Sequence, residues 1–133
     1  MSITEVTTSR APAPTGAYSQ AVLVDGWCYV SGQVGWNADR TGLGDRSAAE
    51  QALQAMENIS QLLAEVGMTL INVVKTTIYL ADFNTFKAVN EAYEERMKLE
   101  GVEIFPARTT IGANIRVAVE IDVVARVSQA PRA

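Results

Sequence analysis

The sequence contains no histidine and only one cysteine, Cys28, among its 133 residues. Without an imidazole base, neither a Ser–His–Asp nor a Cys–His arrangement for nucleophilic catalysis can form within one chain. A zinc-type site would be left to carboxylates alone, so we expect no metal and no cofactor. A lone cysteine forms no internal disulfide, which fits the reducing cytoplasm, and we expect Cys28 to be a small core residue. Any chemistry is left to carboxylates, tyrosine, lysine and bound water.

The chain also lacks a long apolar run and a cluster of basic residues. No run approaches the ~18 apolar residues of a membrane-spanning helix. The N-terminal MSITEVTTSR has neither the basic start nor the apolar segment of a secretory signal. The net charge is −4, and the basic residues are scattered. Because such a surface repels phosphate backbones, we expect a cytoplasmic protein that binds neither membranes nor nucleic acids.

What the chain does have is enough apolar material for one core, since hydrophobic residues make up 48% of it. We therefore expect a single domain over residues 1–133. Residues 1–15 are polar and carry prolines, which is typical of an extended N-terminal arm. Two β-prone runs within Ala21–Val34 are joined by Asp25-Gly26, the dipeptide of a tight hairpin turn.

Two amphipathic helices follow the hairpin. Ser47 and Glu50 have the Ser-x-x-Glu spacing of a capping box, and Gly67 is a natural stop for the helix that they open. The buried stripe expected for this helix, at steps of three and four, consists of Ala49, Leu53, Met56, Ile59, Leu63 and Val66. The second helix lies within residues 84–101, ends at Gly101, and has a stripe of Phe86, Val89, Tyr93 and Met97.

The remaining β-prone runs, residues 73–81, 107–112 and 115–127, complete the order β-β-α-β-α-β-β of an α+β fold. Two helices cannot cover both faces of a five-stranded sheet, so we expect both on one face. In the run 115–127 one row is apolar, whereas the opposite row mixes apolar with charged residues. We expect this half-apolar face to pack against other copies of the chain, although an antiparallel sheet can also leave one face to water.

Two charged residues stand in strands with apolar neighbours. In the segment FPARTTIG, Arg108 is a rigid guanidinium fork that can grip a carboxylate with two parallel hydrogen bonds. The alternative is a structural ion pair with Glu120 or Asp122. Glu120 lies between Val119 and Ile121, where burial would raise its pKa and suit it to act as a base. Alternatively, Glu120 is a surface glutamate, and with Asp122 alone it makes a poor magnesium site.

Four segments resemble the RidA/YjgF family, also called the L-PSP endoribonuclease family: GAYSQAV (16–22), YVSGQVGWN (29–37), VVKTTIYLADFNTFKAVNEAYEE (73–95), and FPARTTIG through VEID (105–122). The resemblance implies a chorismate-mutase-like fold of the bacillus type, assembled as a homotrimer with active-site clefts between subunits. It also implies an enamine/imine deaminase, which converts 2-imino and 2-enamino acids such as 2-aminoacrylate to 2-keto acids and ammonia.

The resemblance also implies roles for single residues. Arg108 would bind the carboxylate of a small substrate together with the backbone N–H of Thr110, and Glu120 would position and partly activate the attacking water. Further positions that match substrate-binding residues of the family are Tyr18, Ser31, Gly32 and Asn90.

The segment between the two signature residues departs from the family pattern. Residues 109–119 form a shorter connection than is typical of the family, and Thr110 stands where RidA proteins often carry cysteine. We therefore expect a divergent subgroup with its own substrate range. Two alternative functions stay open. One is a non-catalytic protein that binds small carboxylates or acts as a chaperone. The other is an endoribonuclease, which the acidic balance and the absence of histidine disfavour.

Overall fold

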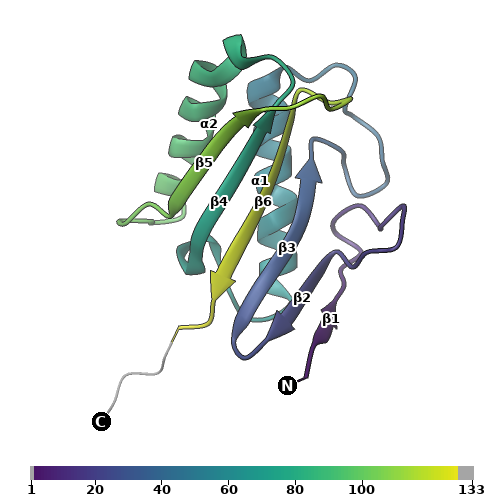
Figure 1. The fold of residues 1–133 in the computed structure, drawn as a ribbon, viewed down its shortest axis with the longest axis vertical. Helices are drawn as coiled ribbons and strands as arrows, with labels where there is room; N and C mark the ends of the chain where they lie inside the picture. Colours follow the sequence, from purple (N-terminus) through teal and green to yellow (C-terminus); the bar gives the residue numbers. More distant parts are fainter. Residues whose placement is uncertain (1, 129–133) are drawn as a thin grey trace.

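The computed structural model describes residues 2–128, which form a six-stranded sheet with two helices on one face (Figure 1). The sheet order is β1-β2-β3-β6-β4-β5, with β4 and β5 parallel and the other pairs antiparallel. In chain order the elements are β1 (Thr4–Val6), β2 (Ala21–Val24), β3 (Trp27–Val34), α1 (Ala48–Ala64), β4 (Val73–Leu80), α2 (Phe86–Leu99), β5 (Ala107–Gly112) and β6 (Val119–Arg126). Short 3-10 turns, Leu70–Asn72 and Phe83–Thr85, precede β4 and α2.

The α+β class and the placement of both helices on one face are confirmed. The predicted element order lacks one strand, because part of the N-terminal arm pairs with β2 as the short antiparallel strand β1. A polar segment of three residues carries too little alternation to be recognised as a strand from its sequence.

Local sequence signals set the turns as predicted. Asp25 and Gly26 join β2 to β3 with φ angles of 50° and 80°, the two positive values that a tight hairpin turn requires. At the start of α1 the N–H of Glu50 donates to Ser47 Oγ (3.2 Å), and the N–H of Ser47 donates to Glu50 Oε1 (3.0 Å). This is the predicted capping box. Gly67, with a φ of 72°, turns the chain away just after α1.

The core lies between the helices and the covered face of the sheet. On α1 the predicted stripe is right for Met56, Ile59 and Leu63, which are fully buried, and wrong for Leu53, which is 42% exposed. Ala52 takes the inner position beside Leu53, because a small side chain lets the helix pack closely on the sheet. In the described part of the chain, neither helix is long and apolar enough to cross a membrane.

The last strand begins later than its apolar pattern predicts. β6 starts at Val119, so Ile115 and Val117 lie outside it. Just before the strand, the N–H of Ala118 donates to the side chain of Gln51 on α1 (3.0 Å) instead of to a neighbouring strand. The buried residues that face the helices from β3 and β6 are Cys28, Val30, Val119, Ile121, Val123 and Ala125. Cys28 is thus the core residue that the sequence predicts.

Asn58 is a fully buried polar residue that joins α1 to the end of β3. Its Nδ2 donates to the carbonyl oxygens of Val34 (3.1 Å) and Trp36 (2.9 Å), and its Oδ1 accepts a hydrogen bond from Gln54 (2.9 Å). The side chain therefore fixes the point at which the chain leaves β3.

We expect Asn58→Ala to lower the free energy of unfolding by about 2–3 kcal/mol, because two carbonyl groups lose their donor and a small cavity remains. The control is Gln61→Ala, which removes only an exposed bond to Glu57 on the same helix and should cost under about 0.5 kcal/mol. Urea unfolding followed by circular dichroism measures both values. Equal losses in the two variants would contradict the role given to Asn58.

Candidate functional site

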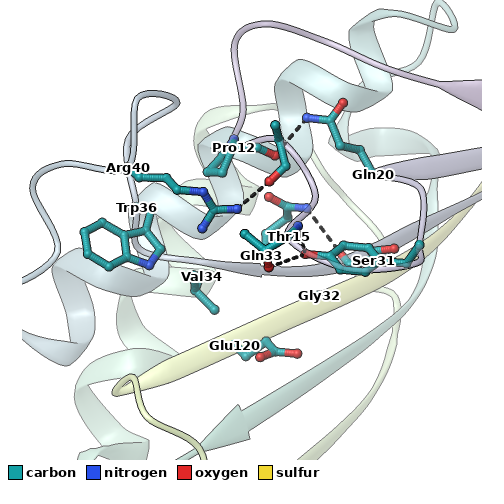
Figure 2. Close-up of a pocket in the computed structure, with 12 residues that line it drawn as sticks. Pro12, Thr15, Gln20, Ser31, Gly32, Gln33, Val34, Trp36, Arg40 and Glu120 are labelled. Carbon is teal, nitrogen blue, oxygen red and sulfur yellow. Dashed lines mark hydrogen bonds between the residues drawn. The ribbon is translucent and has the colours of Figure 1, made fainter.

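A hollow of about 480 Å³ lies between the N-terminal arm, β3 and the loop that follows β3 (Figure 2). Four of the predicted site residues line it: Tyr18 from the segment between the arm and β2, Ser31 and Gly32 from β3, and Glu120 from β6. Residues far apart in the sequence are thus brought together around one space, as the resemblance implies for these four.

The arm forms one wall of this hollow because the buried side chain of Gln20 holds it. Gln20 Oε1 accepts the N–H of Thr8 (2.9 Å), and Nε2 donates to the carbonyl oxygens of Ala11 (3.2 Å) and Pro12 (2.9 Å). A single glutamine therefore satisfies the backbone of a segment that has no partner strand of its own there.

The carboxylate of Glu120 lies against the backbone of β3 at Gly32. A β-bulge between Val30 and Gln33 interrupts the pairing of β3 with β6 at this point. A Cβ atom at position 32 would collide with the Glu120 carboxylate, so any residue other than glycine there would displace this carboxylate from its position. Figure 2 shows Glu120 on β6 beneath this stretch of β3. The bulge and the glycine together place a carboxylate in the floor of the hollow.

Burial raises the pKa of the Glu120 carboxyl above its usual range, and the neighbouring Asp122 carboxylate raises it further. This is the direction that the strand pattern predicts. A carboxylate with a raised pKa is a stronger base towards water than an ordinary glutamate. Asp122 also raises the pKa of the Tyr79 hydroxyl, which lies opposite Glu120 on β4.

Ser31 and Tyr18 make bonds that limit what each can offer a ligand. Ser31 Oγ donates to the carbonyl oxygen of Ser19 (2.6 Å), so the Ser31 hydroxyl is left as an acceptor. Tyr18 is half exposed, and its hydroxyl oxygen accepts the N–H of Thr15 (3.2 Å). The hydrogen bonds with Thr15, and to a smaller degree the positive charge of Arg40, lower the pKa of Tyr18.

Arg108 and Asn90 line a different hollow, of about 450 Å³, between α2 and the start of β5. The guanidinium carbon of Arg108 lies 5.2 Å from the ring centroid of Tyr93 and 5.8 Å from that of Phe86. Among residues 2–128, no carboxylate lies within 4.0 Å of Arg108, so the alternative of an ion pair with Glu120 or Asp122 is not found. The aromatic rings orient the guanidinium while leaving its N–H groups available for an anion.

Thr110 lies two residues beyond Arg108 on the same face of β5. Its Oγ1 is buried and has no hydrogen-bond partner among the described residues. Ala113 N–H donates to Leu80 O on β4 (2.9 Å). Since alternate residues of a parallel strand bond to the same neighbour, the N–H groups of Arg108 and Thr110 point away from β4 and out of the sheet edge.

One chain does not bring Arg108 and Glu120 together. Arg108 pairs with Thr76 of β4 and shares its face, and Thr76 is bonded to Tyr93 on α2 (2.9 Å). Glu120 pairs with Tyr79 of β4 on the opposite, uncovered face of the sheet. The two residues therefore belong to separate hollows, with β4 between their strands.

Arg40 also lines the hollow of Glu120, although no sequence pattern points to it as a site residue. It lies in the turn-rich loop between β3 and α1, and its side chain reaches the carbonyl oxygen of Ala13 in the arm. Nothing in the composition of that loop distinguishes an arginine at a site from a solvated one. In the described part of the chain, no group of three or more cysteine and acidic side chains is placed to hold a metal ion.

The raised pKa of Glu120 has a consequence for stability. Ionising this carboxyl is less favourable in the folded than in the unfolded chain, so charge at Glu120 destabilises the fold above the raised pKa. Below the unfolded value of about 4.3 both states are protonated and the cost disappears. We therefore expect Glu120→Gln to raise the unfolding temperature at pH 7 and to leave it nearly unchanged at about pH 4.

Differential scanning calorimetry at the two pH values measures this effect. Glu91→Gln, which removes an exposed carboxylate of α2, is the matched control and should show no such difference between the two pH values. An unfolding temperature of Glu120→Gln below that of the wild type at pH 7 would overturn the expectation.

Comparison with known proteins agrees with this fold. The family model of endoribonuclease L-PSP matches residues 8–127. A RutC family protein of Aquifex aeolicus is 42% identical over 124 residues, which cover 91% of this chain and 97% of that protein. The 2-iminobutanoate/2-iminopropanoate deaminase of Homo sapiens is 45% identical over 103 residues, 77% of this chain and 72% of the human protein. The crystal structure of E. coli TdcF with bound serine matches with a TM-score of 0.88 at 26% identity, over 94% of this chain and 99% of that one. Sequence and fold thus agree over almost the whole length, and the chain belongs to the RidA/YjgF family, the family of the endoribonuclease L-PSP model.

Proposed function

We propose that this protein is a hydrolase that deaminates reactive 2-imino and 2-enamino acids, such as 2-aminoacrylate, to 2-keto acids and ammonia. The observation that carries this proposal is a pair of complementary groups: a guanidinium at Arg108 with no carboxylate partner among residues 2–128, and a carboxylate with a raised pKa at Glu120. The name of the human relative, a deaminase of 2-imino acids, supports it. The serine bound to TdcF supports a ligand with an amino-acid carboxylate. The single, buried cysteine suits work in a reducing cytoplasm.

In the proposed reaction, Arg108 grips the substrate carboxylate with two parallel hydrogen bonds and so fixes the imine carbon. Glu120 accepts a hydrogen bond from a water molecule. As the water oxygen bonds to the imine carbon, a proton passes to Glu120 and then to the nitrogen. The proton of the new hydroxyl group then passes through Glu120 to the nitrogen as the C–N bond of the tetrahedral adduct breaks, so ammonia leaves and the carbonyl group of the keto acid forms. An enamine first takes a proton on its β-carbon, which gives the same imine.

No histidine is needed in this scheme, because an imine carbon is already electrophilic and a carboxylate of raised pKa is a sufficient base. The other candidate residues complete the substrate site. Thr110 donates its outward N–H to the carboxylate, Asn90 lies beside Arg108, and Tyr18 and Ser31 bound the hollow of Glu120. Gly32 provides the room in which Glu120 and its water fit.

The active site we propose lies between subunits of a homotrimer. Arg108 and Glu120 face opposite sides of one sheet, so a site that uses both needs the edge of β5 from one subunit and the hollow of Glu120 from the next. The outer edge of β5 has no partner strand in the described part of the chain, and the uncovered face of the sheet carries exposed Trp27 and Tyr29. Both features are typical of surfaces that pair with another copy.

The central prediction concerns activity. With 2-aminoacrylate generated from serine by a dehydratase, the wild-type protein should speed the release of the keto acid before semicarbazide traps the intermediate. We expect Arg108→Gln and Glu120→Gln each to lower kcat/KM by about 100-fold or more. The first variant loses the group that binds the substrate carboxylate, and the second loses the base that activates water. Glu91→Gln, which changes an exposed carboxylate that lines neither hollow, should retain full activity.

The outcomes of that assay separate the alternatives. A wild type that binds small carboxylates through Arg108 but is indifferent to Glu120→Gln would be a non-catalytic binding protein. RNA cleavage that weakens steeply with salt would instead favour the endoribonuclease, which the net charge of −4 disfavours.

A mixture of the two inactive variants tests whether each active site is formed by two subunits. Arg108→Gln and Glu120→Gln proteins are unfolded together, refolded at equal concentrations and assayed. If each site joins Arg108 of one subunit to Glu120 of the next, random assembly restores about a quarter of the wild-type sites, because both subunits of a site must supply the intact residue. Each variant refolded alone is the control. No recovery in a mixture that sediments as trimers would contradict a site between subunits.

A further inference from the structure

Arg40 is a second cation of the site, held at the rim of the hollow that contains Glu120 (Figure 2). Its backbone has a φ of 62°, the left-handed conformation that residues other than glycine rarely adopt. Figure 2 shows its side chain extending from the loop towards the arm, above Val34 and beside Trp36. The fold thus uses an unusual backbone conformation to carry a guanidinium to this place.

The loop that carries Arg40 is braced from both sides. Arg40 N–H donates to Asn37 O (2.8 Å), and Asn37 N–H donates to Thr41 O (3.0 Å). Arg46 holds the loop from behind, through Nη1 to Gly35 O (2.8 Å) and Nη2 to Asn37 Oδ1 (2.7 Å). The turn therefore holds Arg40 towards the hollow.

The charge of Arg40 is not compensated within the described residues. The nearest carboxylate in sequence, Asp39, accepts the N–H (3.2 Å) and the hydroxyl (2.6 Å) of Thr41 instead. No carboxylate in residues 2–128 lies within 4.0 Å of Arg40. A guanidinium has five N–H donors, and one of those of Arg40 donates to Ala13 O. The remaining donors are available to a ligand.

We infer that Arg40 binds a second acidic group of the substrate, so that the enzyme prefers 2-imino dicarboxylic acids to 2-imino acids with an uncharged side chain. This inference rests on the proposed function, in which Arg108 of a neighbouring subunit holds the carboxylate next to the imine. The two guanidinium groups then grip the two ends of the substrate, with Glu120 and its water between them. The hollow of about 480 Å³ has the size of a small-molecule pocket.

Two other roles for Arg40 predict different behaviour. If Arg40 only ties the loop to the arm through Ala13, its loss should affect all substrates alike through the shape of the hollow. If Arg40 itself holds the carboxylate next to the imine, its loss should abolish activity on every substrate. Only contact with a second acidic group makes the effect depend on the substrate.

The test compares two imino acids of equal chain length, 2-iminoglutarate and 2-iminopentanoate, which amino-acid oxidases generate in place from glutamate and norvaline. We expect kcat/KM of the wild type to be about tenfold or more higher for 2-iminoglutarate, because a charge-assisted bond to guanidinium is lost in the other substrate. Arg40→Gln, which can still donate to Ala13 O, should remove this preference and change kcat/KM for 2-iminopentanoate less than about threefold. Arg10→Gln, an exposed arginine of the arm, is the matched control and should keep the preference.

A binding measurement adds a readout that does not depend on turnover. By calorimetry, 2-oxoglutarate should bind the wild type more tightly than 2-oxopentanoate, and Arg40→Gln should bind both equally. The inference is overturned if the wild type hydrolyses 2-iminopropanoate but shows no preference for the second acidic group. It is also overturned if Arg40→Gln lowers kcat/KM for both five-carbon substrates by the same factor. A wild type that accelerates hydrolysis of none of the three imino acids overturns the proposed function itself.

Discussion

Successive side chains of a β-strand point to opposite faces of the sheet, and this alternation decides where the reactive groups of the protein stand. β4 is the central reference, because it pairs with β5 on one side and with β6 on the other. Arg108 pairs with Thr76 of β4 and therefore lies on the face that the helices cover. Glu120 pairs with Tyr79 of β4 and therefore lies on the uncovered face. A shift of the β4–β6 pairing by one residue would turn Ile78 or Ile121 out of the core, so burial of these side chains enforces the register that places Glu120.

The position of the Glu120 carboxylate on the uncovered face lowers the stability of the fold. Glu120 is partly removed from water and lies near Asp122, and both conditions oppose its charge. The space for it comes from Gly32 and a bulge, which weaken the ladder between β3 and β6 locally. A partly buried carboxyl, a glycine and a bulge all lower the stability of the sheet. Such costs are typical of sites that transfer protons and are not expected in a strand with a purely structural role.

The parts of the fold that follow from short-range chemistry could be predicted from the sequence. The Asp25-Gly26 turn and the capping box of Ser47 with Glu50 depend only on residues next to one another. The start of β6 could not be predicted, because a side chain of α1, Gln51, takes the N–H of Ala118 across the molecule. Apolar alternation alone continues back to Ile115 and says nothing of that partner.

The residues of the candidate site likewise divide into those that the sequence predicts and those that it does not. Arg108 and Glu120 stand out as charges in apolar strands, and the family signature assigns them a joint role. That they face opposite sides of one sheet follows from their pairing with β4, which no local pattern contains. Arg40 left no trace in the sequence, because its place depends on a left-handed backbone and on contact with Ala13 in the distant arm.

The residues of the strands and those of the loops contribute differently to such a site. Arg108 and Glu120 lie in strands fixed by ladders of hydrogen bonds, which suits the step that the proposed reaction shares among all imino acids. Arg40 and the segment between β5 and β6 lie in loops, where substrate range is more readily altered. These loops are not independent, because Gln51 donates to the carbonyl of Arg46 (3.1 Å) in one and accepts the N–H of Ala118 (3.0 Å) at the end of the other. One buried glutamine thus joins the loop that carries Arg40 to the segment between β5 and β6.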